Sequence, residues 1–583
     1  MTRMIGGMVM RWGLTLVAML VLLGPAVCQE QGSAQGTSEA KVEFDKAETA
    51  RKKGDFKTAV DHYRRAIELD PDYTDAHEYY IFTSGDVATN KEVRDAVFSG
   101  KATPEQRAEF KKQREENSQR LKAEYGKLAE EHPAQAGYQW ALGDLNMYDD
   151  PKAAIRYFEA SLKINPKFAP GYQSLSLMDE IQGDLDGMRE NLHRAVDAAP
   201  NDPKYLFDYA YAFHHSDPKE FTRLSLEVVN RFPDSERAAQ ALFWLAESTP
   251  TESEKLHYLE MLRDDQAPAA QDWKGGGLAM LFDIYMKSDP AKAYALAKGL
   301  IKKYPDDSWK SFATYAKAIG DADRFLKRDK AGKALKALEK VKLPKWYDRE
   351  HHLLVLTRAR ALNANKQPKQ AYDALLQAYA TAPNDEIHTE LVSYGKELGK
   401  NVEQVDGDVW DLQVKNSSPA EPFSLPSYTS DKPMSLDDFR GRVILLNFWY
   451  PLCGPCRGEF PYIQAVLDKY KDQGFDIVAV NVLPTQDELV LPLLKGFKLG
   501  FIPLKGSEDF AETVYKVRGE PTNFLIGANG RIYFGPLHPI SSPESQRTLE
   551  LQVEALLRAK QAEKESKPAG DHPATSPVGS RHD

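Results

Sequence analysis

The sequence predicts a two-part chain, an all-α solenoid of helical repeats followed by a smaller α/β domain. Helical repeats dominate the first 400 residues, where Pro166 and Pro200 end similar segments 34 residues apart. Further on, the apolar run Val443–Trp449 is followed at once by Cys453 and Cys456. A chain of 583 residues is also too long for one hydrophobic core, so more than one domain is expected.

The N-terminus has the pattern of a secretory signal peptide over residues 1–28. Two arginines precede a short apolar run, 12–23, which ends before a small-x-small site at Cys28. An uncleaved membrane anchor is the first alternative, but the run is shorter than the roughly 20 residues that a span needs. A lipoprotein acylated at Cys28 is the second, although Val27 is bulkier than the residue usual there. We expect an exported protein, in a bacterial periplasm or on an extracytoplasmic face, with membrane anchoring as the minor alternative.

Net charge and cysteine content limit the classes of function that the chain can have. The net charge of -10 argues against nucleic acid as a partner. Of the three cysteines, only Cys453 and Cys456 remain if processing removes or acylates Cys28. One CxxC pair without structural disulfides, in an exported protein of this size, indicates a catalytic dithiol. A zinc half-site would need two more ligands at matching spacing, and the sequence has no second CxxC, so we expect no metal and no cofactor.

The first part contains recognisable repeats. Residues 29–40 are rich in Gln, Ser and Gly and are predicted to be disordered, whereas 41–400 have helical periodicity. Small residues, a large apolar residue and a terminal proline recur in three units, at about 40–73, 135–168 and 169–202. This pattern resembles the tetratricopeptide repeat family, which implies an α-solenoid that makes protein–protein contacts. The repeat count after residue 203 stays open.

Three further segments complete the division of the chain. The charged stretch 104–131, between the first and second repeats, is predicted to be an inserted helix, or a lengthened repeat helix, that lies against the solenoid. The polar segment 401–422 is predicted to be a linker, and short β-rich runs then alternate with helices over 423–559. The tail 560–583 is predicted to be disordered.

Within the α/β domain, strand, CxxC and helix follow one another directly. Val443–Trp449 is apolar throughout, as in a strand that is buried on both faces, and an amphipathic helix is expected over 457–471. This order places Cys453 at a helix N-terminus, where unpaired N–H groups and the helix dipole stabilise a thiolate. Cys456 follows one turn later and can close a small disulfide ring. We therefore expect a reversible dithiol with Cys453 exposed to its substrate.

The motifs of this domain resemble the thioredoxin-like family and, within it, the ResA/TlpA branch of extracytoplasmic thiol–disulfide oxidoreductases. The resemblance covers residues 420–559 and implies a thioredoxin fold. Its most specific parts are Asn447-Phe-Trp449, Cys453-Gly-Pro-Cys456-Arg457, Glu459-x-Pro461 and Gly519-Glu-Pro521-Thr-x-Phe-Leu-Ile526.

The resemblance also implies roles for individual residues. Cys453 would be the attacking thiol, Cys456 the resolving thiol and Glu459 the acid that moves protons between them. The residues implied to contact substrate are a cis-proline at Pro521, together with Glu520 and Trp449. Three alternatives stay open: a structural disulfide, an ordinary first-turn helix carboxylate at Glu459, and a trans turn proline at Pro521.

The sequence departs from the family at two places. The residue before the first cysteine is usually Trp, but here it is Leu452, so substrate contacts at that point are in doubt. Related peroxidases place Pro seven residues and Thr or Ser three residues before the reactive cysteine. Before Cys453 these positions hold Leu446 and Tyr450, which makes peroxidase the weaker enzyme interpretation.

We therefore predict an exported thiol–disulfide oxidoreductase that reduces or isomerises disulfides of protein substrates. Gly-Pro between the cysteines matches reducing members of the family, and a reductant in an oxidising compartment needs a membrane electron donor. The family suggests apocytochrome c as one substrate. The alternative from another class is a protein-interaction scaffold in which the thioredoxin-like domain is a binding platform, and a thiol peroxidase is the weaker alternative.

Overall fold

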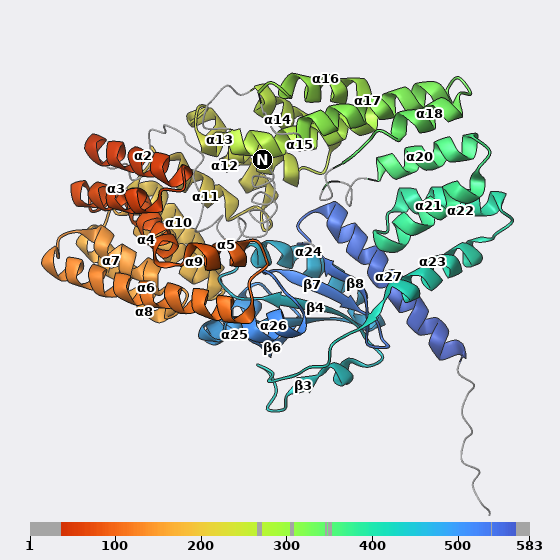
Figure 1. Cartoon of the computed structure of the whole chain (residues 1–583). Coiled ribbons are helices and arrows are strands. Elements are labelled where there is room, and N and C mark those ends of the chain that lie inside the picture. The colour runs from red at the N-terminus through yellow and green to blue at the C-terminus, as the bar shows by residue number, and fades with distance from the viewer. Residues whose placement is uncertain are drawn as a thin grey trace, which may run out of the picture.

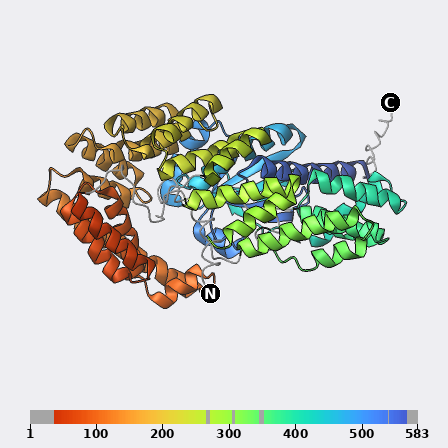
Figure 2. The same cartoon turned by 90° about the horizontal axis from the view of Figure 1, so that it is seen from above.

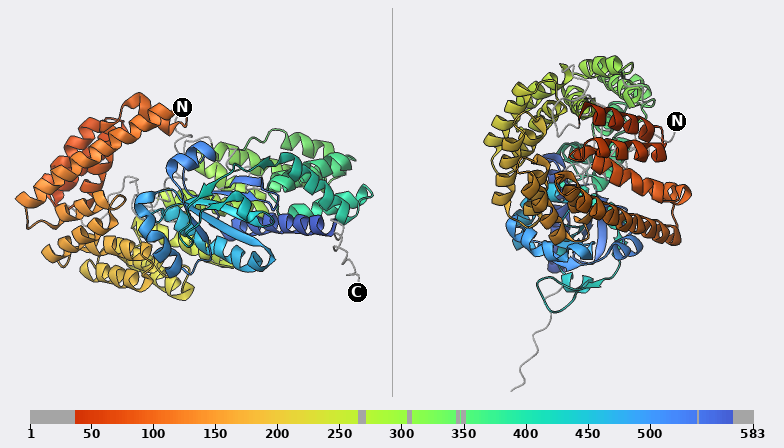
Figure 3. Two further views of the ribbon diagram at one scale, coloured as in Figure 1. Left: turned by 90° about the horizontal axis from the view of Figure 1, so that it is seen from below. Right: turned by 90° about the vertical axis from the view of Figure 1, so that its left-hand side faces the viewer.

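In the computed structural model, the described residues are 37–264, 271–303, 308–343, 347, 352–537 and 539–566. The predicted signal peptide and Cys28 lie outside them. An arch of helices curves around a smaller α/β domain, which lies beneath its centre (Figure 1). The view from above shows the first helices bending away from the rest of the arch (Figure 2), and the view from below shows the α/β domain between the two arms (Figure 3). The predicted two-part fold is confirmed.

The first arm of the arch contains the repeats that the sequence revealed, joined by a long inserted helix. Its helices are α2 (Ser38–Lys52), α3 (Phe56–Leu69), α4 (Thr74–Ala88), α5 (Lys91–Phe98), α6 (Pro104–Glu131), α7 (Ala136–Asn146), α8 (Pro151–Ile164), α9 (Ala169–Ile181) and α10 (Leu185–Ala198). The pairs α2/α3, α7/α8 and α9/α10 match the three predicted units. Helix α6 packs against α4 and α7, as expected for the charged insertion.

Helix pairs continue beyond residue 203, where the sequence pattern is degenerate. The helices are α11 (Pro203–Tyr211), α12 (Pro218–Arg231), α13 (Glu236–Ser248), α14 (Glu252–Asp264), α15 (Gln271–Ser288), α16 (Pro290–Leu300), α17 (Ser308–Leu326), α18 (Ala331–Leu338), α20 (Leu353–Ala364), α21 (Pro368–Thr381), α22 (Asp385–Glu397) and α23 (Val402–Asn416). Each helix packs mainly on its neighbours in the chain, which is the solenoid principle.

Local signals explain why the repeats turn where they do. In α3, α8 and α10 the helix begins after an aspartate, Asp55, Asp150 or Asp184, whose carboxylate accepts a hydrogen bond from a first-turn N–H group. Before two of these caps the chain passes through the left-handed region at Gly54 and Gly183, with φ of 80° and 76°. A short, rigid turn therefore joins the two helices of a repeat.

Three predicted boundaries are wrong. The supposed linker 401–422 is mostly helix α23, which starts with a capping box between Asn401 and Gln404 and leads directly into the sheet. Residues 37–40 belong to helix α2, capped by Thr37, rather than to a disordered segment. At the other end, α27 (Pro543–Ser566) extends past the predicted boundary at 559. In each case a polar composition that suggested a linker or a disordered segment belongs to a helix.

The α/β domain contains a six-stranded sheet in the order β1-β8-β7-β4-β5-β6. Its strands are β1 (Ser418–Pro419), β4 (Val443–Trp449), β5 (Phe475–Asn481), β6 (Ile502–Lys505), β7 (Thr522–Ile526) and β8 (Arg531–Leu537), and β2 (Ser424–Leu425) pairs with β3 (Met434–Ser435) separately. Strands β4, β5 and β6 are parallel, whereas β7 is antiparallel to both β4 and β8. This mixed sheet is the thioredoxin-like arrangement that the sequence predicts.

The two faces of the sheet are covered by different elements. On one face lie α24 (Gly454–Tyr470), α25 (Asp487–Gly496) and α27, which pack on Val443, Leu445 and Trp449 of β4. On the other face, Ile444 and Phe448 pack on β2, β3 and α26 (Glu508–Val514). Because alternate residues of a strand point to opposite faces, Asn447 lies on the α24 side. The short 3-10 turns η2 (Leu436–Phe439), η3 (Lys471–Gln473) and η4 (Pro484–Gln486) complete the domain.

Candidate active site

The two cysteines form a disulfide at the N-terminus of α24. Cys453 is the N-cap residue, and its sulfur accepts a hydrogen bond from the N–H of Cys456 at 3.2 Å. The Cα atoms of the two residues are 5.2 Å apart. The dithiol therefore lies where a strand ends and a helix begins, as the sequence predicts, and the same N–H group and helix dipole would stabilise a thiolate on Cys453 after reduction.

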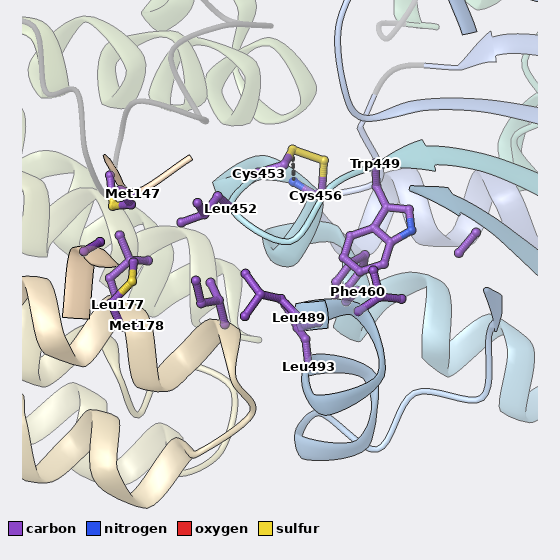
Figure 4. Close-up of a cluster of buried hydrophobic side chains, with 14 of the residues drawn as sticks. Met147, Leu177, Met178, Trp449, Leu452, Cys453, Cys456, Phe460, Leu489 and Leu493 are labelled. Carbon is purple, nitrogen blue, oxygen red and sulfur yellow. Dashed lines mark hydrogen bonds between the residues drawn. A yellow bond between two sulfur atoms is a disulfide. The ribbon is translucent and has the colours of Figure 1, made fainter. Parts of the chain in front are cut away.

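The expectation that Cys453 is exposed is wrong for this conformation. Cys453 and Cys456 are both 0% exposed, and they share one buried apolar cluster with solenoid residues such as Met147 and Met178. Figure 4 shows Leu452, next to Cys453, pointing toward Met147 at the end of α7. The sequence could not reveal this because the contact joins segments about 300 residues apart. The solenoid covers the dithiol.

Glu459 lies beneath the site and is fully buried. Its two carboxyl oxygens accept hydrogen bonds from Asn447 Nδ2 (2.7 Å), Asn523 Nδ2 (3.0 Å to the nearer oxygen) and the Ile540 N–H (3.2 Å). Burial raises the pKa of Glu459 to about 8, although these hydrogen bonds lower it. At neutral pH the carboxyl group is therefore mostly protonated, and its minor ionised fraction can accept a proton. An ordinary first-turn helix carboxylate would face solvent, so this environment favours a proton-transfer role.

The Glu520–Pro521 peptide bond is cis, which removes the trans alternative. Thr522, the next residue, pairs with Phe448 of β4, so Pro521 lies beside the end of the strand that leads to the CxxC loop. Glu520 is half-buried, and burial with repulsion from the Glu508 carboxylate raises its pKa to about 7. Pro521 itself is buried, so of these two residues only Glu520 is partly accessible to a substrate in this conformation.

Trp449 does not fit the predicted substrate-binding role. It is fully buried, and its ring packs edge-on against Phe460 at 5.3 Å inside the core (Figure 4). The last residue of β4 points toward α24, so its ring fills the space between sheet and helix instead of facing a client. Trp449 supports the site as a packing residue.

Four residues of the site were not singled out for a role from the sequence. Asn447 and Asn523 face each other across β4 and β7 and hold Glu459. Gln486 is buried and accepts a hydrogen bond from the Leu452 N–H at 2.9 Å. Arg457 follows the second cysteine and is 4% exposed. The sequence feature that could have revealed two of them is the asparagine within each of two apolar runs, Asn447 and Asn523. A polar residue in a buried strand needs a hydrogen-bond partner.

Arg457 connects the dithiol loop to the solenoid. Its guanidinium donates to the Pro451 carbonyl at 2.9 Å and makes two hydrogen bonds, at 3.1 and 3.2 Å, to the carboxylate of Glu180 in α9. The side chain of Arg457 is 3% exposed and that of Glu180 16%. A planar two-point contact of this kind fixes both partners in position. The solenoid is therefore held next to the CxxC loop by a buried ion pair.

Metal and membrane features were sought in the part of the chain that the structure describes. There, no group of three or more His, Cys, Asp or Glu side chains is arranged to hold a metal ion. Likewise, no helix within the described ranges combines the length and apolarity that a bilayer crossing requires.

Comparison with family models supports both predicted resemblances. Residues 415–490 match the family described as Redoxin, and residues 49–79 match the family described as TPR repeat. The first match contains the CxxC motif, and the second coincides with helices α3 and α4. The resemblance of the C-terminal domain to thioredoxin-like proteins and of the N-terminal region to tetratricopeptide repeats is confirmed.

Individual relatives match about a fifth of the chain. The chain is 34% identical over 119 residues to the thiol-disulfide oxidoreductase ResA of Bacillus subtilis, covering 20% of this chain and 65% of that protein. ResA of Geobacillus kaustophilus is 38% identical over 97 residues, which cover 17% of this chain and 55% of the relative. The chain thus spans less than two thirds of the length of these relatives.

Solved structures match about a quarter of the chain. A putative thiol:disulfide interchange protein DsbE from Chlorobium tepidum is 33% identical, with a TM-score of 0.22, and the match covers 24% of this chain and 96% of that structure. A putative thioredoxin from Neisseria meningitidis is 28% identical, with a TM-score of 0.22 and coverage of 26% and 97%.

Proposed function

We propose that this protein is an exported thiol–disulfide oxidoreductase that reduces or isomerises disulfides in protein substrates. The observation that carries the proposal is a disulfide at a helix N-terminus, Cys453–Cys456, above a buried acid whose pKa is raised to about 8. Perturbed pKa values cluster at functional sites, and a dithiol that gains and loses protons can use a nearby acid–base group. The names of the relatives support the same activity.

The reduced dithiol would act in two steps. The Cys453 thiolate attacks a sulfur of the client disulfide, a mixed disulfide forms, and the client's other sulfur leaves as a thiolate that takes up a proton. Cys456 then loses its proton, attacks the Cys453 sulfur and releases the second client thiolate. Two electrons pass from the dithiol to the client, and the enzyme is left as the disulfide seen in the structure.

Glu459 would be the group that accepts and returns the Cys456 proton. It lies one helical turn after Cys456, and a carboxyl group with a pKa of about 8 exchanges protons readily near neutral pH. Asn447 and Asn523 position it. Pro521 has no N–H group, so the backbone beside it can face an extended client segment. A membrane electron donor that reduces the disulfide again belongs to this proposal, as does an extracytoplasmic location.

One observation favours a second candidate, the interaction scaffold. Both cysteines are buried under the solenoid, and a dithiol that never opens would act as a structural element of a binding platform. In that case the repeat surface would carry the function.

Insulin reduction separates the two candidates. With a chemical reductant as electron source, the wild-type chain should accelerate insulin precipitation, and Cys453→Ser should lower the rate by about a thousandfold because the thiolate that attacks the client disulfide is lost. Cys456→Ser should accumulate mixed disulfides with client proteins, since the resolving step is lost. Equal turnover by wild type and Cys453→Ser would remove the oxidoreductase proposal.

A further inference from the structure

A defined patch of the solenoid lies directly on the CxxC loop. We call this patch the cap; its residues are Met147, Tyr148, Leu177, Met178, Glu180 and Gly183, from the ends of α7 and α9. Met147 and Met178 belong to the same buried cluster as Leu452 and Leu489 of the thioredoxin-like domain (Figure 4). The cap thus contributes aliphatic side chains to the surface around the dithiol, where a client segment would have to bind.

The cap also supplies a negative charge. Glu180 pairs with Arg457, next to Cys456 in the sequence, and this pair is among the least exposed ion pairs between the two domains. Arg457 is held from the other side by the Pro451 carbonyl at 2.9 Å. A buried guanidinium needs a hydrogen-bond acceptor. Any group that replaces the cap must therefore supply an acceptor to Arg457 or leave its guanidinium exposed to water.

A close backbone contact of the interface is at Gly183. A Cβ atom at this position would lie 2.3 Å from the Pro492 carbonyl oxygen and 3.0 Å from the Gly496 Cα at the end of α25. Gly183 also has φ of 76°, in the left-handed region. The turn between α9 and α10 therefore packs on α25 without room for a side chain.

The rim of the interface is polar and exposed, unlike its centre. Lys111 forms an ion pair with Glu508 at 2.8 Å, with side chains 77% and 53% exposed. Thr485 donates a hydrogen bond to the Tyr148 carbonyl at 3.0 Å. Exposed pairs of this kind contribute little free energy. A small apolar centre and one buried ion pair therefore hold the cap, which suits a contact that must be released.

We propose that the cap occupies the client site of the dithiol, so that a client must displace it by offering the same chemistry. Such a client is a disulfide-bonded segment with aliphatic side chains for Leu452 and Leu489 and an acidic side chain for Arg457. The closed form shields the Cys453–Cys456 pair from other thiols and disulfides. This inference rests on the proposed function and defines the class of substrate that the site accepts.

The first experiment measures access to Cys453 without requiring exchange activity. The reduced full-length chain is alkylated with iodoacetamide, and modification of Cys453 is followed by peptide mass spectrometry. Gly183→Asn keeps a residue that tolerates the left-handed region but puts a side chain into α25, so Cys453 should react at least about tenfold faster than in wild type.

Gly54→Asn is the matched control. Gly54 occupies the same place in the first repeat, with φ of 80°, and a Cβ there meets no atom within 4 Å. Cys453 should be alkylated at the same rate in Gly54→Asn as in wild type. Equal rates of Cys453 alkylation in wild type, Gly183→Asn and Gly54→Asn would show that the cap does not limit access to Cys453.

A second variant keeps the test decisive if Gly183→Asn does not fold. Glu180→Lys places like charges together at Arg457 and should also speed alkylation about tenfold or more. Glu190→Lys reverses a charge on α10, in an exposed pair with Arg194, and should leave the rate unchanged. Unchanged rates in both charge variants would contradict the proposal.

The second experiment tests the client class. Two synthetic disulfide peptides, identical except for Glu or Lys beside an aliphatic run, are reduced by the full-length chain with a chemical reductant as electron source. The Glu peptide should have a kcat/KM about tenfold higher, and Arg457→Gln should abolish this preference. No preference in the wild-type chain would overturn the assigned client class. A third outcome is that no variant reduces either peptide, but Cys453 is still alkylated faster in Gly183→Asn than in wild type. In that case the proposed oxidoreductase function is wrong, whereas coverage of Cys453 by the cap is supported.

Discussion

The two sides of the dithiol are built from different interactions. Beneath it, the floor formed by Glu459, Asn447 and Asn523 belongs to one domain and contains a carboxyl group without a cation. Above it, the cap contributes Glu180, which is neutralised by Arg457 from the other domain. The floor joins two paired strands and the helix packed on them, whereas the cap joins residues of two separate domains. We infer that the floor sets the proton chemistry of the site and the cap sets access to it.

The largest expected effect tests the floor through Glu459→Gln. The pKa of Glu459 rises from 4.5 to about 8 on folding. The carboxyl group therefore opposes folding increasingly as the pH rises through this window and has no effect below it. Relative to wild type, Glu459→Gln should gain on the order of 3–5 kcal/mol of unfolding free energy between pH 4.5 and pH 8.

Urea unfolding of the oxidised full-length chain at several pH values measures this gain. Glu488→Gln is a suitable control, since the Glu488 side chain is 74% exposed. If the unfolding free energies of wild type and Glu459→Gln changed with pH in parallel, Glu459 would not have the raised pKa described for it.

Asn523→Ala tests the hydrogen bonds that hold Glu459 in the floor. Asn523 donates to Glu459 and so lowers its pKa against the effect of burial. Its removal should raise the Glu459 pKa above about 8 and cost about 1–3 kcal/mol of stability. In a Glu459→Gln background the pH-dependent part of this effect should vanish; if it persists, another group is titrating.

Glu180→Gln tests the cap with a smaller effect on stability. Removing one partner of a buried ion pair is costly when the other must stay buried, but Arg457 can reach water if the cap opens. We therefore expect a loss of only about 1 kcal/mol in unfolding free energy together with faster alkylation of Cys453. A loss above about 3 kcal/mol without a change in alkylation would show that the cap does not open.

The smallest effect is expected at the rim. Lys152 pairs with Glu488 across the two domains, and their side chains are 72% and 74% exposed. Lys152→Gln should change the unfolding free energy by less than about 0.5 kcal/mol and leave alkylation of Cys453 unchanged, because solvent screens such a pair. A clear increase in alkylation would show that rim charges, and not Glu180, hold the cap.

The far end of the solenoid shows why the sequence prediction of domain boundaries failed. The supposed linker is α23, whose Trp410 stacks on Tyr533 of β8 at 5.1 Å. Nearby, Arg547 of α27 makes two hydrogen bonds of 2.9 Å to Asp385 of α22. These partners lie far apart in the sequence, and a polar amphipathic helix has nearly the composition of a linker. Only its packing distinguishes the two.

Local pattern alone predicted the place of the dithiol and the fold classes of the two domains. A buried strand, a CxxC pair and an amphipathic helix must place Cys453 at a helix N-terminus, and recurring small residues and prolines must stack as helix pairs. These features depend on neighbours within about one repeat. The tertiary structure decided that Cys453 is covered, that Trp449 is a packing residue, and that Glu459 is held by two asparagines. Each of these depends on contacts between distant segments, such as Glu180 with Arg457, whose positions no sequence periodicity encodes.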